Sequence, residues 1–438
     1  MRTEADSFDI LDRALKAANA DEADAVFISS DSNNSRFANS QIHQNMSEVS
    51  AELTLRVFVA GAMGVASTTS FDRAEIEEMA NTAREAARHS LPLPKFNGLY
   101  KVCGPASAGR LKPARTPPPA EKARALKEVF ARDAKFAGSY GTSISSVACG
   151  NTHGIRRYCT TSVAEATVIA IRGEQSGYAT AIARDAIDVI ALGDEALERA
   201  TLNENARAKI EPGAYDVILE PAAIAEVLEW MEMITFSGQS FEDGSSFFVD
   251  NLGKPMLSKS LTIADDAIDP DFLPFPFDLE GLPKRRIVLI DKGAPKTPVV
   301  DKIYADRLGI EPTANCWALG SPDHGMALHP AIEPGDATRE EMIRSTQRGI
   351  WVTRFNYVNG LLEPKTALMT GTTRDGTFLI RDGEVAARLP NLRWTQSIVE
   401  AFSRIVALTR DRRRVGAWFN AFGGALSPAI KIEGWHFD

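Results

Sequence analysis

The feature that most constrains the fold of this chain is an alternating stretch that begins at residue 49. Apolar side chains recur at every second position, at Val49, Ala51, Leu53, Leu55, Val57 and Val59. Residues two apart in a strand lie on the same face, so the pattern predicts a long β-strand with one buried face. Gly61 allows a tight turn into a partner strand at residues 64–68.

Helical patterns flank this predicted hairpin. Residues 9–20 place their apolar side chains on one face, and residues 71–88 do the same, with Ser70 as the expected N-cap. A short strand is expected at residues 25–29. The first part of the chain is therefore predicted to be an α/β unit, which ends at a proline-rich linker between residues 92 and 119.

The central part begins with a predicted helix at residues 120–134 and ends with one at 188–203. Between them the pattern predicts four antiparallel strands, at residues 142–148, 154–160, 164–171 and 177–184. Beyond residue 213 a short strand and a strong helix pattern at 222–236 come first. Glycine turns then separate short apolar runs, with further helices expected near residues 339–347 and 395–406.

These patterns predict an α+β protein with three parts. Residues 1–110 are expected to form an N-terminal α/β domain with an antiparallel sheet and helices. Residues 111–210 are expected to form a central α+β region that packs with it. Residues 211–438 are expected to form a β-rich, barrel-like C-terminal domain. The length of 438 residues agrees with two or three domains.

The charge balance argues against nucleic acid as a partner. The net charge is −9, and the densest basic run is Arg410, Arg412, Arg413 and Arg414. We expect this run to be a solvated loop or helix end, because no aromatic side chains for base stacking interleave it.

The chain also carries no sign of a membrane or an export pathway. It has no apolar run of the ~20 residues that a membrane-spanning helix needs, and its first residues lack the apolar core of a secretory signal. The four cysteines form no CxxC pair, and Cys149 and Cys159, which flank a predicted hairpin, are expected to be buried thiols. We therefore expect a cytoplasmic protein.

Several segments, in order along the chain, resemble the TldD/PmbA family, also called the modulator of DNA gyrase family. They are SRFANSQIHQN with AELTLRVFVAGAMGVAST, IEPGAYDVILEPAAIAEVL, FEDGSSF, GDATREEMIRSTQRGIWVTRF, TGTTRDGTFLIRDGEV and PAIKIEGWHF. Their shared order covers nearly the whole chain. The resemblance implies a metallopeptidase-related fold, with a role in peptide or protein processing.

Active TldD-like members of the family carry H-E-x-x-x-H on the helix that opens the C-terminal domain. Two imidazoles at that spacing can face one zinc ion if the helix bends or unwinds slightly between them, and the Glu can take a proton from zinc-bound water. Aligned without gaps, the three motif positions hold Glu229, Trp230 and Ile234. No histidine lies between His153 and His324, so no shift of register restores the motif.

The third zinc ligand of the family, a Cys in a glycine-rich stretch near the C-terminus, has no match in residues 412–428. We therefore expect no catalytic residue, no metal and no cofactor. The pattern resembles the PmbA (TldE) branch, which lacks the motif and pairs with TldD. The implied partners are a TldD-like metallopeptidase subunit, a second copy in a dimer, and a peptide substrate.

Other residues are weaker candidates for a site. Glu226, Glu229 and Glu232 lie near one helix face and suit Ca²⁺ or Mg²⁺ better than zinc, but we expect them to form an exposed acidic face. His324 and His329 lie in a Gly/Pro-rich loop near Asp323 and Cys316, with no recognised metal spacing. The binding candidates are Arg36, Asn39, His43, His324 and His329.

Three functions stay open from the sequence. The favoured one is a non-catalytic subunit that assists a TldD-like zinc peptidase. The second is an independent metallohydrolase with non-standard ligands around His324 and His329, and the third is a homodimeric peptide-binding protein. Neither a G-x-S-x-G elbow nor a phosphate-binding glycine loop occurs.

Overall fold

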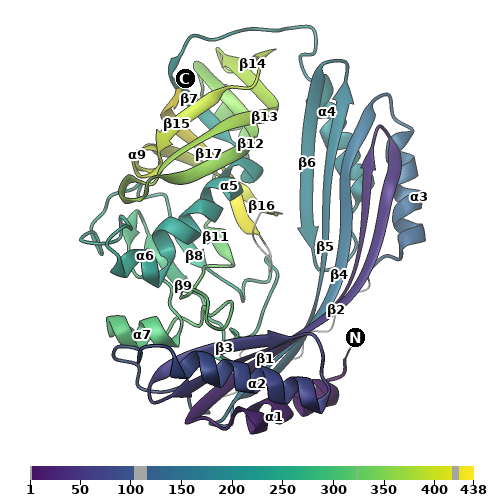
Figure 1. The fold of residues 1–438 in the computed structure, drawn as a ribbon. Coiled ribbons are helices and arrows are strands. Elements are labelled where there is room, and N and C mark those ends of the chain that lie inside the picture. Colours follow the sequence, from purple (N-terminus) through teal and green to yellow (C-terminus); the bar gives the residue numbers. More distant parts are fainter. Residues whose placement is uncertain (1, 103–115, 323, 417–423) are drawn as a thin grey trace.

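The computed structural model describes residues 2–102, 116–322, 324–416 and 424–438, which form two sheets with helices around them (Figure 1). The first sheet has six strands in the order β3-β2-β1-β4-β5-β6, and every pair is antiparallel. Its strands are β1 (Glu22–Ala38), β2 (Gln41–Val59), β3 (Ala62–Thr68), β4 (Lys135–Asn151), β5 (Arg156–Arg172) and β6 (Gln175–Ala183).

Four helices cover one face of this sheet: α1 (Glu4–Ala18), α2 (Arg73–Arg88), α3 (Pro119–Phe130) and α4 (Val189–Thr201). In strand β1, alternate side chains point to opposite faces of the sheet and pack with different layers. Phe27 packs with α1 and α2, and Phe37, on the same face, packs with α3 and α4. Val26 and Ile28 point the other way and pack with loops of the C-terminal part. The six-stranded sheet is therefore buried between two layers along much of its length.

The second sheet belongs to the C-terminal part and has eleven strands, of which nine follow the path β10-β9-β8-β11-β17-β7-β12-β13-β14. β15 pairs with β13, and β16 pairs with β17. The strands are β7 (Gly213–Leu219), β8 (Ile263–Asp265), β9 (Ile287–Asp291), β10 (Ala294–Pro295), β11 (Pro330–Ile332), β12 (Arg348–Glu363), β13 (Leu368–Arg381), β14 (Glu384–Arg388), β15 (Arg393–Ser397), β16 (Ile405–Val415) and β17 (Ala425–Phe437).

Helix α5 (Pro221–Met231) packs against β12 and β17, and its apolar side chains join the largest core cluster. The shorter helices of this part are α6 (Gly238–Glu242), α7 (Lys302–Leu308), α8 (Arg339–Arg344) and α9 (Ile398–Ser403). The sheet curls into a half-barrel. The predicted fold class, α+β with an antiparallel sheet first and a barrel-like β-rich part second, is therefore confirmed. The predicted domain boundaries stay a prediction. Strands β1 to β6 form one sheet, which continues from the first predicted part into the second.

Several local predictions were wrong. The strand expected at residues 25–29 is β1 and spans Glu22–Ala38, since its polar second half pairs with both β2 and β4. The expected strands 154–160 and 164–171 are one strand, β5, because Thr161 to Val163 continue the pairing with β4. Asp72, not Ser70, caps α2, and its carboxylate accepts a hydrogen bond from the Glu75 amide at 3.1 Å.

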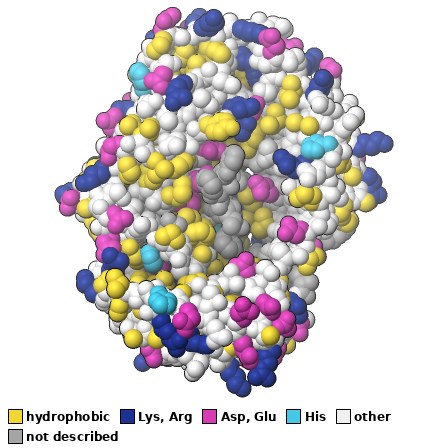
Figure 2. All heavy atoms as spheres, in the orientation of Figure 1, with side chains coloured by type: hydrophobic (Ala, Val, Ile, Leu, Met, Phe, Trp, Pro, Cys, Tyr) yellow, Lys and Arg dark blue, Asp and Glu magenta, His cyan; other side chains and the backbone are white. Residues whose placement is uncertain are grey.

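The basic run also differs from its prediction. It lies on strand β16 rather than in a loop or at a helix end. Arg412 pairs with Asp269 at 3.0 Å, and Arg413 pairs with Glu195 at 2.7 Å. On the face drawn in Figure 2, basic and acidic side chains are interspersed among the described residues. None of the helices in the described part of the chain has the length and apolar character that crossing a membrane requires.

Candidate functional site

The helix that carries the three zinc-motif positions changes its geometry between them. Helix α5 ends at Met231, and the chain continues as a π-helix over Glu232–Phe236. A π-turn joins residues five apart by hydrogen bonds. Such turns are rare in proteins overall, and those that occur often lie at functional sites. Glu229 and Ile234, the two positions that hold histidines in H-E-x-x-x-H, lie on either side of this transition. The backbone thus widens from an α-helix to a π-helix between the two positions, but neither position holds a zinc ligand of the motif.

Each motif position is occupied by a residue that takes part in packing. Ile234 is 5% exposed and belongs to the main core cluster. Trp230 donates a hydrogen bond from its indole nitrogen to the Val358 carbonyl at 2.8 Å. Its ring lies so close to Gly360 that a Cβ there would come within 3.0 Å of it. Trp230 therefore packs against strand β12. In an active TldD-like relative this motif position holds the Glu that acts as general base.

Glu226, Glu229 and Glu232 do not form an exposed acidic face, so that prediction was wrong. Glu229 and Glu232 are each 3% exposed, and Glu226 is partly buried. The spacing of three does place them along one side of the helix. That side is covered because α5 packs against β12, β16 and β17, and β12 and β17 come from distant segments.

These carboxyl groups have unusual proton affinities. Burial raises the pKa of Glu226 to about 7, with Glu229 adding to the rise and Arg354 opposing it. Burial also raises the pKa of Glu232 well above its ordinary value, and the charges of Glu229 and Asp265 add to this. Burial therefore favours the protonated form of Glu232, and Glu226 titrates near neutral pH.

Zinc does not fit these residues. Carboxyl groups whose pKa burial raises, a Trp and an Ile offer none of the imidazole or thiolate donors that a hydrolytic zinc needs. Across the described ranges, no group of three or more His, Cys, Asp or Glu is arranged to hold a metal ion. The stretch in which a third ligand was sought includes residues 417–423, which lie outside the described residues.

His324 and His329 do not share a site. His324 Nδ1 lies 2.9 Å from Asp301 Oδ2, and its ring stacks on Tyr304. His329 is 1% exposed, neither of its ring nitrogens has a hydrogen-bond partner among the described residues, and its ring meets Phe272 edge-on. Burial lowers the pKa of His329 to about 4, so it is neutral at physiological pH. Asp323 lies outside the described residues.

Arg36, Asn39 and His43 all lie at the end of the β1–β2 hairpin, and all three are exposed. Asn39 adopts a left-handed conformation, with φ 50°, in the turn that joins the two strands. The structure brings these residues together on one hairpin, away from α5. They remain candidates for contact with a partner or a peptide.

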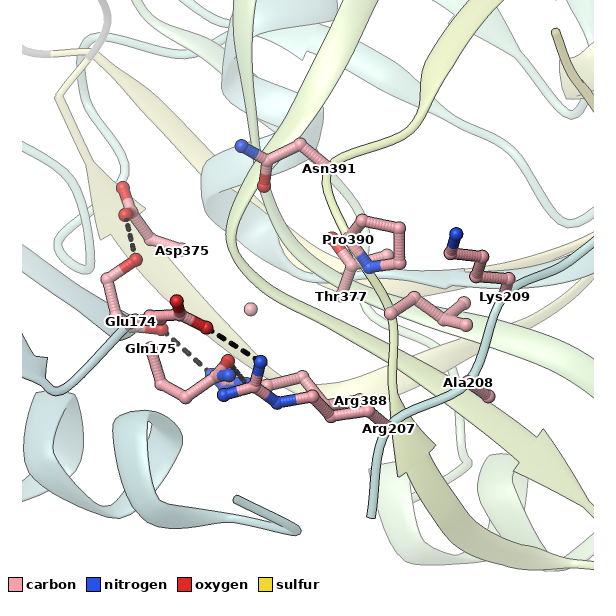
Figure 3. A pocket seen from close by; sticks show the side chains of 13 residues that line it. Glu174, Gln175, Arg207, Ala208, Lys209, Asp375, Thr377, Arg388, Pro390 and Asn391 are labelled. Atoms are coloured by element: carbon pink, nitrogen blue, oxygen red, sulfur yellow. Dashed lines mark hydrogen bonds and ion pairs between the residues drawn. The ribbon is translucent and has the colours of Figure 1, made fainter. Parts of the chain in front are cut away.

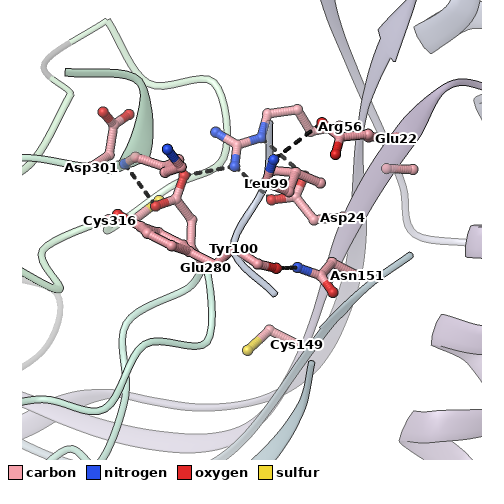
Figure 4. A network of polar contacts seen from close by, with 12 residues as sticks. Glu22, Asp24, Arg56, Leu99, Tyr100, Cys149, Asn151, Glu280, Asp301 and Cys316 are labelled. Carbon is pink, nitrogen blue, oxygen red and sulfur yellow. Dashed lines mark hydrogen bonds and ion pairs between the residues drawn. The ribbon is translucent and has the colours of Figure 1, made fainter. Parts of the chain in front are cut away.

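A buried ion-pair network, which the sequence did not indicate, joins the six-stranded sheet to a loop of the C-terminal part (Figure 4). Arg56 on β2 donates to Asp24 on β1 and, at 2.7 Å, to Glu280 in the C-terminal part. The second Glu280 oxygen accepts from the Lys302 amide at 2.9 Å. Arg56 is 0% exposed. Burial raises the pKa of Glu280 to about 8, and Arg56 opposes this rise.

A pocket lies elsewhere, where three segments of the chain meet (Figure 3). It has a volume of about 500 Å³. Its walls come from the β5–β6 turn, from the segment that leads to β7, and from β13 and β14 with the residues that follow. No motif pointed to it, because its polar side chains are far apart in the sequence. They are Glu174, Gln175, Ser176, Arg207, Lys209, Asp375, Thr377, Arg388 and Asn391.

Comparison with sequence families shows that this is a metallopeptidase-related protein. PmbA/TldA metallopeptidase domain 1 matches residues 23–87, the central domain matches 112–204, and the C-terminal domain matches 212–438. The chain therefore belongs to the TldD/PmbA family.

Individual relatives are distant. A metalloprotease of Methanothermobacter thermautotrophicus is 22% identical over 249 residues, which is 54% of each chain. A metalloprotease TldD homolog of Buchnera aphidicola is 24% identical over 255 residues, which is 55% of this chain and 51% of the relative. The chain thus spans about half the length of the curated relatives it matches.

Two solved structures share the fold over nearly their whole length. TldE from Thermococcus kodakarensis superposes with a TM-score of 0.82 at 20% identity, covering 98% of this chain and 99% of its own. A protein of Bacteroides thetaiotaomicron described as a modulator of DNA gyrase gives a TM-score of 0.83 at 21% identity, covering 100% of both chains.

Proposed function

We propose that this chain is a non-catalytic subunit of the TldE/PmbA type, which assists a TldD-like zinc peptidase in cytoplasmic processing of peptides or proteins. The observation that carries the proposal is the helix at the motif positions. A π-turn lies within the stretch that carries the motif positions, and Glu229, Trp230 and Ile234 occupy the positions of the ligands and the base. Trp230 and Ile234 take part in packing, so this helix offers no zinc ligands at those positions, which supports a role beside a subunit that carries them.

The surroundings of this helix support the proposal. Trp230 holds the outer half of β12, where Tyr357, Leu361 and Leu362 are 80%, 66% and 50% exposed. Tyr357 has a φ of 52°, an unfavourable conformation that a bulky residue adopts only where the surroundings enforce it. Large apolar side chains displayed in this way are typical of surfaces that meet another protein.

The decisive experiment is recovery of the partner from the native cell. The tagged chain is expected to bring down a family relative that carries H-E-x-x-x-H, and the complex is expected to show chelator-sensitive peptidase activity. Changing the first His of the partner's motif should abolish that activity, whereas Glu226→Gln in this chain should leave it intact.

Two outcomes would contradict the proposal. Stoichiometric zinc in the isolated chain, with peptidase activity that a chelator removes, would establish an independent metallohydrolase. A dimer of this chain alone, recovered with no relative carrying the motif, would instead favour a homodimeric binding protein.

A further inference from the structure

The pocket described in Figure 3 has the make-up of a ligand site. Glu174, Gln175 and Asp375 line one side, and Lys209 faces them from the other, with Asn391 at a third edge. Leu389, Pro390 and Ala208 supply apolar wall between these polar groups. A concave, partly apolar pocket with a few convergent polar groups at a junction of domains is the usual form of a small-molecule site.

The carboxylates of the pocket already have partners. Glu174 pairs with Arg207 at 2.7 Å. Asp375 accepts from Arg354 Nε at 2.8 Å and from the Ser176 hydroxyl at 2.6 Å. Both acids therefore already have ion-pair partners, and the negative charge of Asp375 also favours the charged form of Arg388.

Two cations of the pocket have no carboxylate partner among the described residues. Arg388 is 4% exposed, and its guanidinium donates to Gln175 Oε1 at 2.7 Å and to the carbonyls of Arg199 and Ser176. Carbonyls satisfy its hydrogen bonds but do not cancel its charge. Lys209 is exposed to the pocket, and its ammonium makes no described hydrogen bond or ion pair. The pocket therefore carries excess positive charge.

The free donors are spread around the pocket rather than gathered at one point. Gln175 uses its oxygen for Arg388, so its amide N–H groups remain available, and no described contact occupies the side-chain amide of Asn391. We propose that this pocket binds a small organic carboxylate, with the anion at Lys209 and Asn391 and the organic body against Leu389 and Pro390. A compact phosphate would leave most of the 500 Å³ unfilled and its apolar wall without a contact.

The test is calorimetric titration of the full chain with four probes: succinate, the dipeptide Ala-Ala, Ala-Ala amide and inorganic phosphate. Saturable binding of succinate or Ala-Ala, and at least tenfold weaker binding of the amide and of phosphate, would support the proposal. Tighter binding of succinate would indicate a free metabolite as the natural source, and tighter binding of Ala-Ala would indicate a peptide C-terminus.

Two variants connect binding to the pocket. Lys209→Gln removes the exposed cation, and Asn391→Asp places a carboxylate beside the ligand, so each is expected to weaken binding about tenfold. Lys127→Gln, on the exposed side of α3, is the matched control and should bind like the unmodified chain. All three positions are exposed, so thermal melting should show them folded.

The proposal is overturned if neither carboxylate binds at tens of millimolar. It is also overturned if the amide or phosphate binds as well as the carboxylates, or if Lys209→Gln behaves like Lys127→Gln. None of these results depends on whether a peptidase partner exists, so the carboxylate site and the proposed subunit role can fail separately.

Discussion

Glu226 lies on α5 between two groups of opposite charge. Glu229, one helical turn further on, raises its pKa, and Arg354 on β12, whose guanidinium stacks over Tyr178, lowers it. Burial contributes more than either and brings the pKa to about 7. The sequence spacing placed the three acids on one side of the helix correctly. It could not show that this side is covered, because β12 and β17 come from residues more distant in the chain.

This raised pKa predicts a definite pH dependence of stability. Between pH 4.5, the ordinary value, and pH 7, the folded chain holds a proton on Glu226 that the unfolded chain releases. The free energy of unfolding should therefore fall as the pH rises through this range. Glu226→Gln removes the ionisation and should be more stable than the unmodified chain at pH 8 by about 1–3 kcal/mol.

Urea unfolding at pH 5 and pH 8 measures the effect of Glu226→Gln. The gain should be small at pH 5 and present at pH 8. Glu384→Gln, at an exposed acid on β14, is the control and should change stability little at either pH. An equal effect of Glu226→Gln at both pH values would contradict the prediction.

At the scale of elements, two helices rest directly on glycines of outer strands. A Cβ at Gly64 of β3 would lie 2.0 Å from the Ala83 carbonyl oxygen of α2. A Cβ at Gly177 of β6 would lie 2.1 Å from the Ala196 carbonyl oxygen of α4. Backbone cannot move aside as a flexible side chain can, so both helices depend on the absence of a side chain at these positions.

We predict that Gly64→Ala and Gly177→Ala each destabilise the fold by about 1–3 kcal/mol, or more where the helix cannot shift. Gly141→Ala in β4 is the matched control, since its nearest atom would be 3.8 Å away, an ordinary contact. Thermal unfolding of the three variants checks this. A loss of stability in Gly141→Ala equal to the other two would remove the steric explanation.

The same elements show what the sequence predicts well. Helices α1 and α2 and the hairpin from β2 to β3 follow from their apolar periodicity, because their buried faces are regular, whereas residues 395–397 and 405–406 of an expected helix lie in strands β15 and β16. The second half of β1, SDSNNSRFA, has too few apolar residues for that signal. It is a strand because β2 and β4 pair with it on both sides, so tertiary pairing decides its conformation.

At the scale of the whole molecule, Arg56 joins the six-stranded sheet to the C-terminal part. Its guanidinium is enclosed by Asp24 from its own sheet and Glu280 from the other part. The sequence gives no sign of this pairing, because an Arg and a Glu separated by more than half of the chain show no pattern. For the same reason the pocket at Lys209 and Arg388 could not be predicted, whereas the altered zinc motif, a local pattern, could.

Removing Arg56 alone should be costly, because the buried carboxyl groups of Asp24 and Glu280 then lose their cation and the hydrogen bonds that it donates. Arg56→Met is expected to lower the free energy of unfolding by about 3–5 kcal/mol. The triple variant Arg56→Met, Asp24→Asn, Glu280→Gln should recover much of this loss, since no buried charge is left unpaired. Urea denaturation measures both.

The control for this prediction is Arg73→Gln, which breaks the exposed pair with Glu77 on α2 and should cost less than about 1 kcal/mol. If Arg56→Met lowers the free energy of unfolding no more than Arg73→Gln does, the network does not stabilise the contact between the six-stranded sheet and the C-terminal part.

The position of β17 has a consequence for biosynthesis. This strand, residues 425–437, lies in the interior of the eleven-stranded sheet and pairs with β7, which is made far earlier. While the ribosome is still translating the residues between them, β7 has one edge with no partner. This edge of β7 therefore stays unpaired until β17 has left the ribosome. Chaperone contact is most needed in that interval, since unpaired strand edges invite aggregation.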